Sequence, residues 1–134
     1  MPKECYPSLP RFAEGARRDR DCRTKRSSLK DLRTFPDPVR DEVGFALYLA
    51  QMGSRGENTK VLKGFSGAGV IEVLEDYDGD TYRSVYTVKF KNAVYVLHCF
   101  QKKSKSGSEL PKQDKDLINS RLQAAQKHAK EDES

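Results

Sequence analysis

Residues 70–100 read VIEVLEDYDGDTYRSVYTVKFKNAVYVLHCF, and the order of apolar runs and turns within them predicts the sheet of this protein. It contains three runs rich in β-branched and aromatic residues, at 70–74, 81–90 and 94–100. The first connection, 76–80, contains Gly79, which adopts a positive φ at little cost. The second, 91–93, is short enough for a hairpin. Three neighbouring runs joined by short turns predict an antiparallel meander.

A pair of helices is predicted before this sheet, over residues 28–52. Leu29 and Leu32 share one helical face, and Pro36 ends the first helix because the residue before a proline avoids the helical conformation. Asp37, followed by a second proline, is a suitable N-cap for the next helix, and Gly53 is expected to end it. The apolar positions of this second helix fall on one face: Val39, Val43, Ala46, Leu47 and Ala50.

A last helix is predicted to open at Pro111, with an apolar stripe formed by Leu117, Ile118, Leu122 and Ala125. The 134 residues suffice for one hydrophobic core with a tail. We expect a domain over residues 27–129, preceded by a basic, mobile arm at 1–26 and followed by a frayed tail at 130–134. A second interpretation of the arm stays open, in which its basic residues contact phosphates.

The composition excludes several classes of protein. There are 25 Lys and Arg against 20 Asp and Glu, a net charge of +5, which suits an anionic partner but is also common on soluble surfaces. Cys5, Cys22 and Cys99 are widely spaced and form no metal-binding motif, so neither a zinc site nor a disulfide framework is expected. No apolar run approaches the roughly 20 residues of a membrane span, and no signal-peptide pattern is present. We therefore expect a cytoplasmic protein without metal or cofactor.

Basic side chains lie on or beside the predicted strands. In an up–down–up meander, the end of the first strand, the start of the second and the end of the third lie at one edge of the sheet. This topology brings Arg83, His98 and Lys102 to the same edge. Further polar residues flank the strands: Lys60, Lys63, Gln101 and Lys103.

Such a set suits metal-free cleavage of RNA. The 2′-hydroxyl must lose a proton, the phosphorane gains negative charge, and the 5′-oxygen needs a proton. A histidine such as His98 can move protons, and a preorganised arginine such as Arg83 can stabilise the phosphorane. Each residue also has a simpler interpretation, because a lone strand arginine is most often a cross-strand partner and a lone strand histidine most often part of the core.

Several blocks of the sequence carry a family resemblance. They are SLKDLRTFP at 28–36, KVLKGFSGAGV at 60–70, GDTYRSVYTV at 79–88, VYVLHCFQKKSKSG at 94–107 and PKQD at 111–114. In this order and spacing they resemble the phage Gp49-like branch of the RelE/HigB toxins, and the likeness covers residues 27–128.

The resemblance implies an α+β fold in which a helical pair packs on a small antiparallel sheet, followed by a C-terminal helix. It also implies a type II toxin that cuts mRNA in the ribosomal A site without a metal, paired with an antitoxin that is usually a helix-turn-helix DNA-binding protein. Arg83 would bind the scissile phosphate, Lys102 would lie beside it, and His98 would carry a proton. Residues that would hold RNA are Lys60, Lys63, Gln101 and Lys103.

Two departures from the family pattern leave other functions open. Members usually open with a strand just before Ser27, where residues 23–26, RTKR, are poor strand material. Leu110 stands where relatives place a threonine N-cap, a loss of about 1 kcal/mol of local helix stability. One alternative is a toxin resembling ParE, which shares the fold but inhibits DNA gyrase without catalysis. Another is an inactive remnant that only binds its antitoxin.

Overall fold

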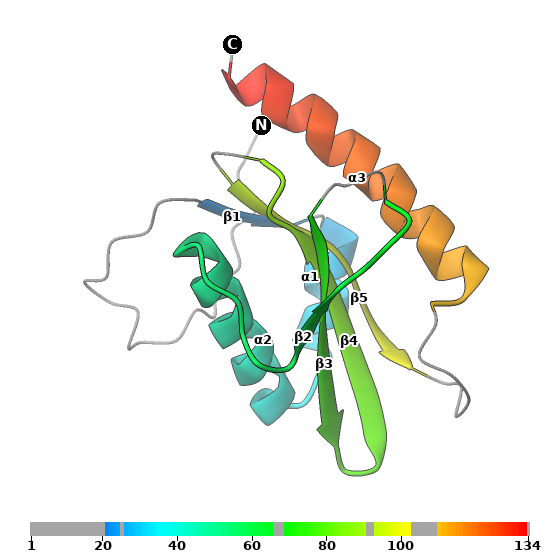
Figure 1. Ribbon diagram of the computed structural model, residues 1–134. Coiled ribbons are helices and arrows are strands. Elements are labelled where there is room, and N and C mark those ends of the chain that lie inside the picture. The colour runs from blue at the N-terminus through cyan, green and yellow to red at the C-terminus, as the bar shows by residue number, and fades with distance from the viewer. Residues whose placement is uncertain (1–20, 25, 66–68, 91–92, 103–109, 134) are drawn as a thin grey trace.

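The computed structural model describes residues 21–24, 26–65, 69–90, 93–102 and 110–133. In chain order the elements are β1 (Asp21–Thr24), α1 (Arg26–Arg33), α2 (Asp37–Gln51), β2 (Thr59–Val61), β3 (Val70–Tyr77), β4 (Asp80–Thr87), β5 (Ala93–Lys102) and α3 (Lys112–Glu133). The strands form one sheet in the order β1-β5-β4-β3-β2, with helices on both of its faces (Figure 1). The predicted α+β class, with two helices before the meander and one after it, is confirmed.

The predicted meander corresponds to β3, β4 and β5, which are antiparallel neighbours. The β3–β4 hairpin closes at the pair Tyr77 and Asp80, and the two residues between them have positive φ angles, 52° at Asp78 and 83° at Gly79. Such a turn matches the right-handed twist of the strands that it connects. The short strand β2 extends the sheet beyond β3 in antiparallel orientation.

A strand does precede Ser27, although residues 23–26 were expected to be poor strand material: β1 spans Asp21–Thr24 and includes the first two of these residues. It pairs in parallel with β5, so that Asp21 lies opposite Ala93 and Thr24 opposite Val96. The reason is that this edge strand is held by backbone hydrogen bonds to β5, and edge strands commonly carry charged residues. The strand and the first residue of α1 lie inside the segment expected to be an arm, and residues 1–20 of that segment lie outside the described residues.

α1 and α2 cover one face of the sheet and meet it through a continuous apolar core. The predicted break at Pro36 is confirmed, although Pro36 itself is the N-cap and Asp37 is already helical, with its carboxylate bound to Arg40. Gly53 follows the end of α2 with φ of 84°, a conformation that favours glycine. The core includes every apolar position predicted for these helices: Leu29, Leu32, Val39, Val43, Ala46, Leu47 and Ala50.

α3 covers the opposite face, where its buried Ile118, Leu122 and Ala125 meet β4 and β5. Leu110 is also buried in this core, which explains an apolar residue at the position of the expected N-cap. α3 continues to Glu133, through most of the segment that was expected to fray. Within the described residues, no helix is long and apolar enough to cross a membrane.

Candidate functional site

A β-bulge in β5 turns His98 toward α3. Val85 of β4 lies opposite His98, whereas the next residue, Tyr86, lies opposite Val96, so Leu97 is the extra residue. Leu97 packs into the core beneath α3, and His98 contacts α3 as well. Two consecutive residues of β5 therefore face the same side, which strict strand alternation would forbid.

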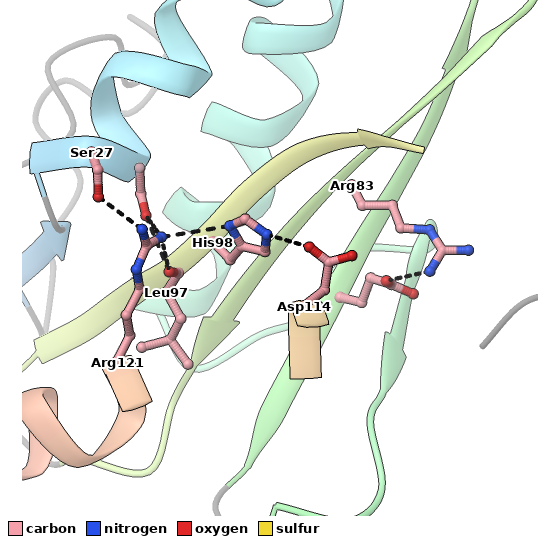
Figure 2. Close-up of polar contacts among 8 residues, drawn as sticks. Ser27, Arg83, Leu97, His98, Asp114 and Arg121 are labelled. Carbon is pink, nitrogen blue, oxygen red and sulfur yellow. Dashed lines mark hydrogen bonds and ion pairs between the residues drawn. The ribbon is translucent and has the colours of Figure 1, made fainter. Parts of the chain in front are cut away.

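Both ring nitrogens of His98 contact side chains of α3 (Figure 2). Nε2 lies 2.9 Å from Oδ1 of Asp114, which stands in the first turn of α3. Nδ1 lies 3.5 Å from Nη1 of Arg121. The ring also stacks on Phe100, with 4.5 Å between centroids and 19° between planes. The side chain of His98 is 8% exposed and that of Asp114 is 24% exposed, so the acid is the member of the pair that water reaches more readily.

Arg121 fastens α3 to β5 and to the start of α1. Its Nη1 donates to the carbonyl oxygen of Leu97 and to Oγ of Ser28, each at 2.8 Å, and its Nη2 donates to Oγ of Ser27 at 2.9 Å. The Ser28 hydroxyl, which is fully buried, donates in turn to the Leu97 carbonyl at 3.1 Å. Burial lowers the pKa of Arg121, and Asp31 partly opposes this shift. These contacts place a cation against the His98 ring.

Arg83 lies on the same face of the sheet but is held by a different acid. It stands opposite Phe100, one diagonal step from His98. Its Nη1 donates to Oε2 of Glu72 at 3.2 Å, and the two side chains are 2% and 0% exposed. In Figure 2 the Arg83 guanidinium points away from His98 and toward this carboxylate. Arg83 and His98 thus share a face of the sheet, which strand order alone did not predict, but they are not joined around a common anion site.

The remaining candidates are spread more widely. Lys60 is half-buried in β2, directly opposite Glu72, whereas Lys63 is exposed in the bend after β2. Gln101 is exposed opposite Tyr82, on the face away from His98. Lys102 ends β5 opposite Thr81, its side chain outside the described part of the chain, and Lys103 lies outside it altogether.

Cys99 follows His98 in the sequence but lies on the other face, in the core beneath α1 and α2. Burial raises the pKa of its thiol to about 12. A buried thiol of this kind is not a nucleophile near neutral pH. Of the two faces of β5, the face that carries His98 is therefore the candidate site.

Three residues of the site were not among the sequence candidates: Glu72, Asp114 and Arg121. Glu72 is the acidic residue inside the otherwise apolar run at 70–74, and that irregularity was a usable signal. Asp114 ends the PKQD block, but sequence distance hides its contact with β5. Arg121 sits in a polar helix, where nothing in the sequence marks it.

Comparison with known proteins places this arrangement in a family. The family profile "Phage derived protein Gp49-like (DUF891)" matches residues 30–123, which include Arg83, His98, Asp114 and Arg121. A search of curated proteins and a search of solved structures each return no match. Membership in this family is consistent with the toxin of a toxin–antitoxin system. Because the match spans most of the chain, from α1 into α3, the protein belongs to the phage-derived Gp49-like family.

Proposed function

We propose that this protein is the toxin of a type II toxin–antitoxin system and that it cleaves mRNA on the ribosome. The observation that carries the proposal is the His98–Asp114 pair, with 2.9 Å between Nε2 and Oδ1, held against the sheet of a Gp49-like protein. A paired imidazole and carboxylate at a partly exposed position is an arrangement that transfers protons. Arg83, one diagonal step away, supplies a positive charge on the same face.

The reaction would be an internal transfer at phosphorus. The 2′-hydroxyl gives its proton to the His98–Asp114 pair, the 2′-oxygen bonds to phosphorus, and the bond from phosphorus to the 5′-oxygen breaks. The products are a 2′,3′-cyclic phosphate and a 5′-hydroxyl, whose proton comes from solvent water. Positive charge near the phosphorane lowers the barrier.

Arg83 could stabilise the phosphorane directly only if its ion pair with Glu72 opens. Its guanidinium is 2% exposed and bound to Glu72, so a phosphate could contact it only after that pair opens. While the pair is closed, Arg83 is a buried positive charge that Glu72 largely neutralises. Lys60, opposite Glu72, is nearer to solvent and is proposed to contact RNA.

The proposed partner is an antitoxin that covers the surface beside this site. Because Arg83 and Glu72 are buried, an acidic antitoxin segment would contact their neighbours rather than the pair itself. Displacement of α3 is the other route to inactivation, since α3 carries Asp114 and Arg121. A complex in which α3 keeps its place and this whole surface stays exposed would contradict both routes.

The test is cleavage in a translating system. Purified protein added to ribosomes translating a defined mRNA should produce discrete cuts, mapped by primer extension. The variant His98→Ala should lose them, and His128→Ala, which replaces the other histidine of the chain, is the matched control. Intact mRNA with the folded wild-type protein would reject the proposal.

A second candidate function is supported by the buried pair of Arg83 and Glu72. A toxin whose strand arginine is neutralised inside the protein has less positive charge to offer a phosphate. This favours a non-catalytic role, either gyrase inhibition of the ParE kind or antitoxin binding alone. Inhibition of DNA supercoiling by purified gyrase, with mRNA left intact, would identify the first. Antitoxin binding with neither effect would identify the second.

A further inference from the structure

The hydrogen-bond partners of His98 fix which of its nitrogens carries the hydrogen. Oδ1 of Asp114 lies 2.9 Å from Nε2, and an ionised carboxylate can only accept, so Nε2 carries a hydrogen and donates it to the acid. In the neutral ring Nδ1 is then the nitrogen without a hydrogen, and it faces Nη1 of Arg121, which can only donate, at 3.5 Å. The ring is a donor to the acid, with no nitrogen left over for a substrate.

The exposure of the two side chains points the same way. His98 is 8% exposed and covered on one side by the ring of Phe100, whereas Asp114 is 24% exposed. Only one oxygen of Asp114 takes part in the contact with His98. An RNA strand that approaches this surface would reach the carboxylate before it reached the imidazole.

We propose that Asp114 is the catalytic residue that takes the proton from the RNA 2′-hydroxyl, and that His98 and Arg121 are positioning residues. This inference rests on the proposed RNA cleavage. Arg121 holds α3 against β5 through the carbonyl of Leu97, and Nε2–H of His98 fixes the carboxylate of Asp114. The proton moves from the 2′-oxygen to Asp114, the bond from the 2′-oxygen to phosphorus forms, and the 5′-oxygen leaves and is protonated by water.

The first experiment separates a positioning histidine from a catalytic one. In His98→Gln, the side-chain amide can still donate to Asp114 but cannot accept and release a proton near neutral pH. We expect His98→Gln to keep its cleavage rate within about 10-fold of wild type, whereas Asp114→Asn loses about 100-fold or more. His98→Ala, which lacks a donor, should be slower than His98→Gln. Asp116→Asn, an exposed acid of the same helix, is the matched control and should cleave as wild type does.

The opposite order would overturn the inference. If His98→Gln is inactive while Asp114→Asn keeps most of its rate, His98 is the proton carrier. Thermal unfolding of each variant shows whether a loss of rate is a loss of folded protein. If wild type itself produces no cuts, it is the proposed function that fails, and the assignment of Asp114 to RNA falls with it.

A second measurement tests the positioning directly and needs no activity. The chain has only two histidines, so His128→Gln leaves His98 as the single imidazole signal. Long-range ¹H–¹⁵N correlation spectra should then show the hydrogen on Nε2, and Asp114→Ala, which removes the acceptor of that hydrogen, should shift the ring toward the other tautomer. A hydrogen on Nδ1 in the otherwise native protein would contradict the inference whatever the cleavage assay shows.

Discussion

Two pairs, each of an acidic and a basic side chain, lie on the α3 face of the sheet, and they differ in how far water reaches them. Arg83 and Glu72 are 2% and 0% exposed, whereas His98 and Asp114 are 8% and 24% exposed. Both partners of the first pair come from adjacent strands, but the second pair joins a strand to a helix. The buried Arg83–Glu72 pair is suited to stabilising the fold. The His98–Asp114 pair, at the start of a helix and partly exposed to water, is suited to proton transfer.

The largest change in stability is expected from breaking the buried Arg83–Glu72 pair. Arg83→Ala leaves the buried carboxylate of Glu72 without this guanidinium, so we expect the free energy of unfolding to fall by about 3–5 kcal/mol. Urea denaturation followed by circular dichroism measures it. The double replacement Arg83→Met with Glu72→Leu removes both charges and should recover most of the loss. A single variant that loses less than about 1 kcal/mol would show that the pair is not structural.

Cys99 extends the comparison to a buried group on the opposite face, for which the described part of the chain supplies no ion pair. Its pKa is raised to about 12 by burial, from an ordinary value of 9.0, so the native state holds the thiol proton that the unfolded chain releases. Stability is therefore complete below about pH 9 and falls as the pH rises toward 12, by about 1.4 kcal/mol per pH unit. Urea midpoints of wild type and Cys99→Ala across this range isolate the effect. Parallel pH curves for the two proteins would refute it.

Part of this comparison was accessible from the sequence. The apolar runs and turn residues of 70–100 predicted the meander, and strand order placed Arg83 and His98 near one edge of the sheet, but that they share a face follows only from the register. β1 was missed because it is held by its partner's backbone rather than by an apolar pattern of its own. Asp114 and Arg121 were missed because the bulge at Leu97, which turns His98 toward α3, leaves no periodic signal in the sequence.

Arg121 is expected to contribute less to stability than the buried Arg83–Glu72 pair, because it is only partly buried and its hydrogen bonds go to neutral groups. Arg121→Gln removes donors to Ser27, Ser28 and the Leu97 carbonyl, and we expect a loss of about 1–2 kcal/mol in the free energy of unfolding. Ser28→Ala should lose part of the same energy, so the double variant is less than additive. Full additivity in urea denaturation would show that the two side chains act independently.

Replacing Asp114 in the His98–Asp114 pair should change stability least, and a small change would separate this pair from the buried one. Asp114 is partly exposed, and Asn keeps an oxygen that can accept from Nε2 of His98, so Asp114→Asn should lower the free energy of unfolding by about 1 kcal/mol or less. The same substitution is expected to remove most of the proposed cleavage activity. If Asp114 contributes little to folding although His98 holds its carboxylate in place, its position serves a purpose other than stability. A loss of 3 kcal/mol or more in Asp114→Asn, comparable to that of Arg83→Ala, would erase the distinction and make both pairs structural.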